Sequence, residues 1–521
     1  MTRDRIDGKN TDHGSSWFVL GSTGDGGETD MQRLSGLDAV FLAAEGPANY
    51  VTHGMAVMVL DPTTMPAGDR VLAVRNYVRE RIHLVPPLQR RLVQVPLGLD
   101  APRWIDDPRV DLDYHVQAAR LPAPVTAVAL GSFVSGLAGH KLDRRYPLWQ
   151  MYVVEGFEGD GLCIVAKLHH SLMDGIAGMQ FMASLFALEP DALAPPAPRP
   201  PVPERRPGDV ANLVGALASM IRRPLFGARA VEETLGAGTR LARHLVDHRR
   251  RGGASLAFPF AAPHLPFDKP ITPRRETAFA SLSLGKIKDV AHAFDVTIND
   301  VVLAVVAGAL RRFLVSLGKL PHKQLVAAVP VSVRGDQGVE QANMISVMLA
   351  GLATDLEDPS HRLVAIHQGA LDAKQLQSAM GSQALMEWLE VPVPALFSLA
   401  TSLYARLHLS SLHPPLCNVL VSDVPGPPVP LYFAGARLDS LFPLGPIFDG
   451  VGLNITAITC LDTLDVGLVA CPDQLPNLWD LASALEPALE ELDAARSTRS
   501  SAKRPSKVRK PRTPGAVAPA H

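Results

Sequence analysis

The segment LCIVAKLHHSLMDG, residues 162–175, joins a strand-forming run to a short polar loop. Its first seven residues, Leu162 to Leu168, are apolar except for one lysine and have the length of a buried β-strand. The preceding run from Trp149 to Val154 is a second strand candidate, and the glycine-rich segment 156–161 suits a tight turn. The sequence therefore predicts a β-hairpin whose second strand ends in two adjacent histidines.

The residues after this strand have the chemistry of a catalytic loop. A histidine at a strand end can project into a cleft from a rigid base. Its ordinary pKa of about 6.5 leaves a neutral imidazole that can take a proton. We predict His170 as the general base and His169 as its support. We expect Asp174 to orient the loop, and Gly175 to allow the turn into a following helix. A lone histidine would suggest only an ordinary strand-end residue, but the whole pattern after a strand favours catalysis.

Changes in composition divide the 521 residues into five parts. The proline density of residues 189–208 forbids a continuous helix or central strand and predicts a linker. Arginines between 222 and 251 make the helical part of this linker basic, which suits packing on the body or contact with anionic lipid. The predicted parts are a disordered N-terminal extension (1–30), an N-terminal α/β domain (31–190), a Pro-rich and helical linker (191–270), a C-terminal α/β domain (271–495) and a disordered basic tail (496–521).

The charge and the cysteines exclude several classes of protein. Eight Lys and Arg residues and no Asp or Glu lie between Arg496 and Arg512. Without them the chain has 42 basic and 52 acidic residues (50 − 8 = 42). An acidic body is the reverse of what a nucleic-acid-binding domain shows, so no nucleic-acid partner is expected. The four cysteines form no CxxC pair, which argues against a zinc site and a disulfide framework and fits a reducing compartment.

Two apolar segments come nearest to a membrane span without reaching its length. Residues 391–405 contain no charged residue and residues 407–422 contain no Lys, Arg, Asp or Glu, but each is interrupted by two prolines. A transmembrane helix needs about 20 predominantly apolar residues in a row. We therefore predict that both segments are core or interfacial and that the chain has no transmembrane helix.

The clearest helix of the second α/β unit follows the segment Thr297–Asp300. Apolar residues at helical spacing form one stripe, and Gly318 suits the position just after the helix. Asn299 is well placed to cap a helix that begins at Asp300, and Asp300 suits the first turn as an anion favoured by the helix dipole. The alternative is that Asn299 and Asp300 bind substrate, and we keep both interpretations.

The HHxxxDG pattern of residues 169–175 resembles the signature of the CoA-dependent acyltransferase superfamily, and the rest of the chain resembles the bacterial wax ester synthase/diacylglycerol acyltransferases. The resemblance covers roughly residues 31–490, and its motifs occur in the expected order. The DFGWG segment of the wider superfamily is not seen, which argues against a condensation domain. The segments that carry the resemblance are Leu34–Leu42, Leu142–Trp149 (LDRxxPLW), Thr297–Leu303 (NDVVL), Pro330–Arg334, Asn418–Pro427 and Gly452–Ile455.

The resemblance implies an α/β fold of two chloramphenicol-acetyltransferase-like domains, joined by a helical linker, with the active-site channel between them. It implies transfer of a long-chain fatty acyl group from acyl-CoA to diacylglycerol, and possible wax ester formation from fatty alcohols. Acyl-CoA would be a co-substrate, and no cofactor and no metal would be required. No G-x-S-x-G elbow occurs, so an acyl-enzyme is not required. The apolar substrates imply a cytoplasmic protein attached peripherally to a membrane or to lipid droplets.

Two alternatives remain open at this point. The same chemistry could serve another hydroxyl acceptor, such as a polyketide or a sugar lipid. A third hypothesis, motivated by the linker helices and the basic tail, is a non-catalytic protein that binds lipid droplets. The intact His-His and Asp-Gly pairs make this third hypothesis the weakest, because a protein without activity has no need of them.

Overall fold

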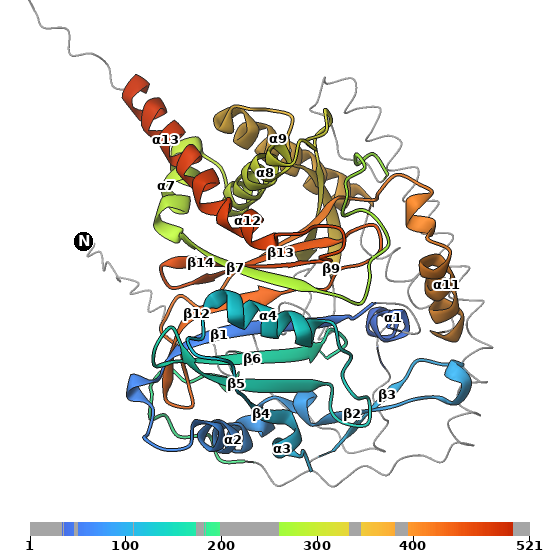
Figure 1. The fold of residues 1–521 in the computed structure, drawn as a ribbon, viewed down its shortest axis with the longest axis vertical. Coiled ribbons are helices and arrows are strands. Elements are labelled where there is room, and N and C mark those ends of the chain that lie inside the picture. Colours follow the sequence, from blue (N-terminus) through green and yellow to red (C-terminus); the bar gives the residue numbers. More distant parts are fainter. Residues whose placement is uncertain are drawn as a thin grey trace, which may run out of the picture.

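The computed structural model describes residues 34, 36–45, 50–107, 109–172, 182, 184–197, 260–332, 345–380 and 394–503. Within these ranges the chain forms two six-stranded mixed sheets and one two-stranded sheet, each large sheet with its own helices (Figure 1). This is the predicted two-domain α/β class. The predictions for residues 1–30, for Asp174 and Gly175 and for the helical linker over 198–259 lie outside the described residues.

The first large sheet has the strand order β11-β12-β1-β6-β5-β4. The predicted hairpin is confirmed, because the neighbours β5 (Trp149–Phe157) and β6 (Gly161–His169) pair antiparallel. On the other side of β6 lies β1 (His53–Asp61), with His53 opposite His169. The histidine pair therefore ends a central strand that is hydrogen-bonded along both edges.

Alternate residues of β6 face two different layers, as the period of two in a strand requires. Leu162 and Ile164 pack with Val74 of α2 (Arg70–Arg81) in one cluster. Cys163 and Val165 pack on the other face with α4 (Ala127–Ala138) and with residues of the C-terminal half such as Phe279. His169 shares the parity of Cys163 and Val165, so it lies on the face directed toward the C-terminal half.

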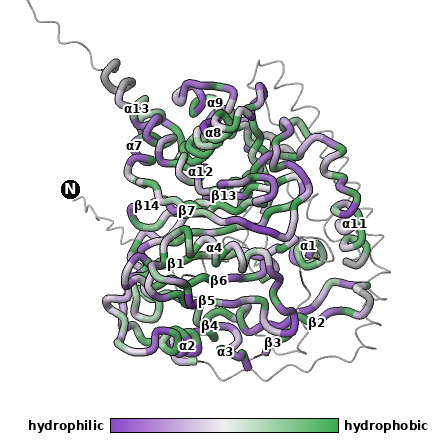
Figure 2. The backbone as a smooth tube through the Cα atoms, in the orientation of Figure 1, coloured by the Kyte–Doolittle hydropathy of each residue, from purple (hydrophilic) through white to green (hydrophobic). Residues whose placement is uncertain are grey.

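The second large sheet has the order β7-β14-β13-β10-β8-β9. Its central helix α8 (Ile298–Ser316) is buried along most of its length, and its hydrophobic positions are green in Figure 2. The predicted helix end is confirmed, since Gly318 follows the C-cap with φ of 65°. The strands are β7 (Glu276–Ser283), β8 (Val326–Ser332), β9 (Ile345–Gly351), β10 (Val419–Val424), β13 (Leu453–Cys460) and β14 (Thr463–Ala470), and the helices around α8 are α7 (Leu284–Phe294), α9 (Pro359–Met380), α12 (Leu478–Ser483) and α13 (Leu485–Lys503).

One segment of the C-terminal half completes the N-terminal sheet. Strand β12 (Ala436–Leu444) pairs antiparallel with β1, and β11 (Tyr432–Phe433) pairs with β12. The prediction that 271–495 forms one separate domain was wrong in this respect, because these strands belong to the sheet that carries the histidines. The crossover joins the two halves covalently and through a shared hydrogen-bonded ladder.

The remaining described elements lie at the edges of the two halves. Helix α1 (Gly36–Ala44) packs against α11 (Pro394–Arg406), so a helix of the C-terminal half lies beside the first helix of the chain (Figure 1). The others are α3 (Leu112–His115), β2 (Arg90–Val93), β3 (Arg103–Asp106), β4 (Val116–Ala119) and the short 3₁₀ turns η1 (Pro62–Thr64), η2 (Ile82–Leu84), η3 (Pro86–Gln89), η4 (Pro96–Gly98) and η5 (Leu409–Ser411).

The C-terminal tail begins later than predicted. Helix α13 runs to Lys503, so residues 496–503 are helical, and the predicted disordered start at Arg496 was wrong. Arg496 extends the helix by donating from Nε to Asp493 Oδ1 one turn earlier (2.7 Å). Residues 504–521 lie outside the described part of the chain.

The four cysteines are buried free thiols, which confirms that they form no disulfide framework. Within the ranges given above, no single helix is long and apolar enough to cross a membrane. The pair α7 and α8 passes such a test only in combination, with a bend of 107° between them, and α8 is core helix here.

Candidate active site

The backbone around the histidine pair is fixed by hydrogen bonds to two neighbouring segments. His169 donates its N–H to Leu148 O (3.0 Å), and His170 donates its N–H to Thr52 O (3.0 Å). Thr52 directly precedes β1, and Leu148 directly precedes β5. The end of β6 is therefore held on both sides, which gives a catalytic side chain the rigid base that orientation requires.

The hydrogen bonds of the His169 ring assign its tautomer. Nδ1 accepts the backbone N–H of Ser171 (3.0 Å) and lies 2.7 Å from the Ser171 hydroxyl. Because Nδ1 is an acceptor, the neutral ring has its proton on Nε2. That nitrogen faces Thr52 Oγ1 (3.1 Å) and Glu45 Oε2 (3.5 Å). His169 is 1% exposed, so its contacts fit the predicted supporting role.

Glu45 is the carboxylate behind His169, and it is only 3% exposed. Its Oε1 accepts the backbone N–H of Thr52 (3.0 Å), and its Oε2 accepts Nη2 of Arg144 (3.2 Å). Burial alone would raise the pKa of Glu45. The interactions with His169 and His53 and the hydrogen bond from Thr52 outweigh burial and hold the pKa of Glu45 well below its usual range. Glu45 is therefore an ionised carboxylate that holds His169 in place.

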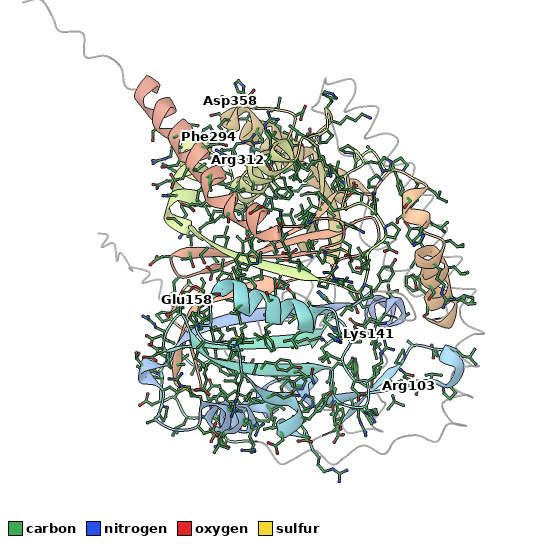
Figure 3. The ribbon with its side chains drawn as sticks, viewed as in Figure 1. Arg103, Lys141, Glu158, Phe294, Arg312 and Asp358 are labelled. Carbon is green, nitrogen blue, oxygen red and sulfur yellow. The ribbon has the colours of Figure 1, made fainter. Side chains whose placement is uncertain are left out.

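The LDR part of the 142–149 motif adds further hydrogen bonds to the network around Glu45 and His53. Arg144 donates to Leu42 O (2.7 Å), a carbonyl in the last turn of α1, as well as to Glu45. Leu142 donates its N–H to His53 Nε2 (3.4 Å), which lies 3.3 Å from Glu45 Oε1. Lys141, labelled in Figure 3, donates to the carbonyl oxygen of Glu45. The motif thus connects α1, β1 and the strand end.

His53, His169 and Glu45 offer ligand atoms close enough together to hold a metal ion. Their hydrogen bonds argue for a different use. Both Glu45 oxygens accept donors, His169 Nδ1 is occupied by Ser171, and the Arg144 guanidinium lies beside the carboxylate. A cation at this position repels a second one. We therefore interpret the three residues as a hydrogen-bonded support, and that the reaction needs no metal stays a prediction.

The His170 ring occupies a different environment from that of His169. It is half-buried and stacks on Phe41 of α1, with ring centroids 5.1 Å apart and planes at 20°. A Cβ atom placed on Gly54 would lie 3.8 Å from His170 Nε2, so glycine keeps the space beside this nitrogen open. No residue in the described part of the chain makes a hydrogen bond to either ring nitrogen.

Burial, with a smaller contribution from the neighbouring His169, lowers the pKa of His170 to about 4. The imidazole is therefore neutral near pH 7, and one of its ring nitrogens keeps a lone pair, which is the state that a general base requires. A hydroxyl group that reached the ring could transfer its proton there while its oxygen attacked an electrophile. The strand end and the stacked neutral ring fit the predicted general base, and that His170 acts as the base stays a prediction.

The site lies where the two halves meet. A small cavity next to His53 is lined by residues of both halves, including Met55 and Ala138 from the first and Arg275 and Val469 from the second. The position agrees with the face that the parity of β6 assigns to His169. The His53 and His169 part of the network thus lies beside residues of both halves of the molecule.

Asn299 and Asp300 lie at the start of α8, and the structure corrects one of their predicted roles. The N-cap is Thr297, whose hydroxyl accepts the N–H of Asp300 (3.2 Å), and not Asn299. Asp300 completes a capping box through Thr297 N (2.9 Å) and is bonded to His367 Nδ1 (2.8 Å). Within the described ranges no hydrogen bond or ion pair joins Asn299 or Asp300 to the histidine network. Substrate binding by these two residues stays a prediction.

Sequence reasoning missed most of the residues that support the histidines. Phe41 and Arg144 lie within segments that were used only as marks of a family. Glu45 lies three residues beyond one such segment, and Thr52 and His53 lie in none of them. No local pattern in the single sequence gives these residues a role. The residues missed are Phe41, Glu45, Thr52, His53 and Arg144.

Solved structures with a similar fold define the class. The structure matches that of a wax ester synthase/diacylglycerol acyltransferase from Marinobacter aquaeolei VT8 with a TM-score of 0.64 and 29% identity, over 90% of this chain and 100% of that one. It matches the fold of a trichothecene 15-O-acetyltransferase from Fusarium sporotrichioides with a TM-score of 0.51 and 13% identity, over 89% and 95% of the two chains. The fold is that of a two-domain acyltransferase.

The family within that class follows from the sequence matches. A model of the wax ester synthase/diacylglycerol acyltransferase catalytic domain matches residues 34–302, and a model of the C-terminal domain of the same family matches residues 341–493. A Mycobacterium tuberculosis strain H37Rv protein named for diacylglycerol O-acyltransferase activity is 38% identical over 464 residues, which are 89% of this chain and 90% of that protein. The chain belongs to the wax ester synthase/diacylglycerol acyltransferase family.

Proposed function

We propose that this enzyme transfers a long-chain fatty acyl group from acyl-CoA to the hydroxyl of diacylglycerol, giving triacylglycerol and CoA, and also makes wax esters from fatty alcohols. The observation that carries the proposal is a neutral His170 at the end of β6, backed by the His169–Glu45 pair. The names of the related proteins support the choice of acyl acceptor.

The reaction needs one proton to move twice. His170 takes the proton of the acceptor hydroxyl as the oxygen attacks the thioester carbonyl, and a tetrahedral intermediate forms. The carbon–sulfur bond then breaks, and the imidazolium returns the proton to the departing CoA thiolate. The step is balanced without an acyl-enzyme, a metal or a cofactor, and acyl-CoA is consumed as a substrate.

His169 and Glu45 do not touch the substrate in this scheme and act as positioning residues. Glu45 accepts from Nε2 of His169, and Ser171 donates to the other ring nitrogen, so the ring next to the base cannot rotate. Asp174 and Gly175 would complete the loop, and Asn299 and Asp300 would contribute from the second half. We propose that the protein is cytoplasmic and attaches peripherally to a membrane or a lipid droplet, since both its acceptor and its product are apolar.

The test is release of CoA by purified protein supplied with palmitoyl-CoA and diolein. His170→Ala is expected to abolish this release and to leave the circular dichroism spectrum unchanged. His361→Ala is the matched control, because His361 is an exposed histidine on α9 paired only loosely with Asp358 (3.8 Å). Full activity in the His170→Ala protein would refute the assignment of the base.

A panel of acceptors then separates the proposal from its alternatives. Diacylglycerol and a long-chain alcohol should release CoA faster than polyketide or sugar-lipid hydroxyls with the same acyl-CoA. A preference for one of the latter would place the enzyme on another acceptor. Binding to lipid emulsions with no CoA release from any acceptor would instead indicate a non-catalytic lipid-binding protein.

A further inference from the structure

Helix α11 (Pro394–Arg406) is apolar on its outer side as well as on its inner side. A helix on the surface of a globular protein ordinarily buries its leucines and exposes its polar residues. Here the side facing the protein has Phe397 and Ala405 packed against the core beside Ser402, which is 3% exposed, and the outer side carries the leucines. The exposed fractions of the outer residues are 62% for Leu396, 56% for Leu399, 45% for Leu403 and 62% for Leu407.

These four leucines form a continuous stripe, since their spacings of three and four residues place them on one side of a helix. The hydroxyls of the inner side bond within the helix, because Ser402 Oγ donates to Ser398 O (2.5 Å) and Thr401 Oγ1 donates to the same oxygen (3.0 Å). The hydroxyl groups of Thr401 and Ser402 therefore have hydrogen-bond acceptors within the helix and do not need water. The leucines on the outer side have no polar group that would favour contact with water.

The stripe continues into the loop after the helix. Leu412 is 77% exposed, the largest value of any leucine in this part of the chain. The loop is held by a hydrogen bond between the Tyr404 hydroxyl and His413 Nε2 (2.7 Å), and Phe260 meets the His413 ring with centroids 5.5 Å apart. Phe260 is itself 54% exposed. We define the α11 patch as Leu396, Leu399, Leu403, Leu407, Leu412 and Phe260.

The charge of the chain segment that carries most of the α11 patch favours one kind of partner. No Asp or Glu occurs between Glu390 and Asp423, whereas the body as a whole carries an excess of acidic residues. The cations and titratable bases of this stretch are Arg406, His408 and His413. A leucine-covered helix that lacks carboxylates and ends in a basic residue has the composition of a helix lying in the interface of an anionic phospholipid layer.

The position of the α11 patch relates it to the active site. Helix α11 packs on α1 and also contacts η4, both in the N-terminal half (Figure 1). Helix α1 provides Phe41, which stacks on His170, and Leu42, whose carbonyl accepts Arg144. Helix α1 therefore lies between α11 and the catalytic base.

We propose that the α11 patch docks the enzyme on an anionic phospholipid surface and so places α1 and the histidine pair next to the lipid from which the acceptor arrives. The docking itself is inferred from the exposed leucines and from the lack of carboxylates in the surrounding sequence. The delivery of the acceptor rests in addition on the proposed function. A second copy of the chain could cover the same leucines, and the experiment distinguishes that outcome.

The test compares two triple variants of the full chain. The stripe variant replaces three of the four leucines, by Leu399→Gln, Leu403→Gln and Leu407→Gln. The control variant replaces one exposed apolar side chain in each of α2, α4 and α8, by Leu72→Gln, Val128→Gln and Val315→Gln; these three side chains are 51%, 54% and 55% exposed. Substitutions at exposed helix positions seldom unfold a protein. Flotation with vesicles of phosphatidylcholine and phosphatidylglycerol should show a partition coefficient at least about tenfold lower for the stripe variant, with the control variant like the wild type.

Activity is measured in parallel to keep the two proposals apart. With a dissolved short-chain alcohol as acceptor, the stripe variant should release CoA at the wild-type rate, because its catalytic residues are intact. With diolein embedded in vesicles, its rate should fall with the partition coefficient. Failure of both proteins to use diolein would contradict the proposed function, while the flotation result would still decide the docking.

Three outcomes would overturn the docking proposal. The wild type would fail to float with vesicles, the stripe variant would float as well as the wild type, or both triple variants would lose flotation equally. A wild-type dimer that becomes a monomer in the stripe variant, with flotation unchanged, would assign the α11 patch to contact between two copies. The basic tail is present in every protein, so it cannot produce a difference between the variants.

Discussion

Each half of the molecule contains a buried carboxylate bonded to a histidine, and the two pairs have different surroundings. In the N-terminal half Glu45 lies 3.5 Å from His169 Nε2, and in the C-terminal half Asp300 lies 2.8 Å from His367 Nδ1. The second pair is the shorter of the two, yet its carboxylate also caps α8. The first pair adjoins a second histidine that has open space beside its ring. A carboxylate–histidine contact is therefore no sign of catalysis by itself. The residues next to the pair indicate whether it supports a catalytic group or a helix start.

The largest expected effect is a difference in kcat between variants of His170, which lies beside the first pair, and of His367, which belongs to the second pair. His170→Ala should lower kcat by about a thousandfold or more, since a positioned general base contributes about 10² to 10⁴ in rate. His367→Ala should leave kcat within about twofold, because its ring serves only the start of α8. Both are measured as CoA release from palmitoyl-CoA and diolein. Equal losses of kcat in the two variants would contradict the assignment of catalysis to the N-terminal half.

The next effect compares the two carboxylates. Glu45→Gln keeps the shape of the side chain and removes the charge that holds His169, so kcat should fall by about 10- to 100-fold through loss of orientation. Asp300→Asn should keep kcat, because any contribution of Asp300 to substrate binding would appear in KM, and it should lower the free energy of unfolding by about 1–2 kcal/mol through the weakened cap. Turnover and denaturant unfolding, measured on both variants, give the two numbers. A stability loss without a kcat loss in the Glu45→Gln protein would make Glu45 purely structural.

The sequence could predict the parts of this site that are local along the chain. The apolar run before His169 specified a strand, and the stripe of α8 specified a helix, because each element buries a repeating face. The histidines themselves were identified by their motif. Glu45 and Thr52 contact His169 from the chain before β1, and Arg144 contacts Glu45 from the chain before β5. Contacts between distant residues leave no periodic signal in a single sequence.

The elements that departed from expectation have physical reasons of the same kind. Strand β12 belongs to the N-terminal sheet because β1 offers it a full ladder partner, which the chain order does not reveal. Helix α13 continues to Lys503 because Arg496 has two carboxylates nearby, Asp493 and Asp289 (2.7 and 3.8 Å), despite the serine-rich composition that follows. Segment 391–405 was predicted as core or interfacial, and α11 has its leucines on the exposed side.

The pH dependence of catalysis sharpens the description of His170. Its pKa is lowered to about 4 by burial, so the free enzyme keeps its base neutral as the pH falls through about 6.5 and protonates it only near 4. At pH 5 about nine tenths of the enzyme should carry the neutral base, against about 3% for an ordinary histidine. We expect kcat/KM to be flat between about pH 5.5 and 7.5 and to fall below that range. A midpoint near 6.5 would contradict the buried state of the ring.

The same shift affects stability, and its sign has to be separated from the kinetic effect. The unfolded chain takes up a proton at His170 below about pH 6.5, whereas the folded protein resists uptake until about pH 4. Falling pH therefore destabilises the fold progressively between these values. The thermal midpoint recorded at each pH shows whether a loss of rate comes from the base or from unfolding.

The smallest expected effect tests the open space that distinguishes the first pair from the second. Gly54→Ala adds a methyl group 3.8 Å from His170 Nε2, an ordinary contact for the ring but an obstacle for a hydroxyl that approaches this nitrogen. We expect kcat/KM to fall by about 3- to 10-fold with the acceptor and the unfolding midpoint to stay almost constant. Gly136→Ala is the matched control, since its methyl group would meet no atom within 4 Å. Gly136 lies in α4, where alanine stabilises a helix by about 0.5–1 kcal/mol relative to glycine, so this control should be as active as the wild type and slightly more stable. If Gly54→Ala were equally harmless, the acceptor hydroxyl would reach His170 from another side, and the open space would not be the reason that this histidine serves as the base.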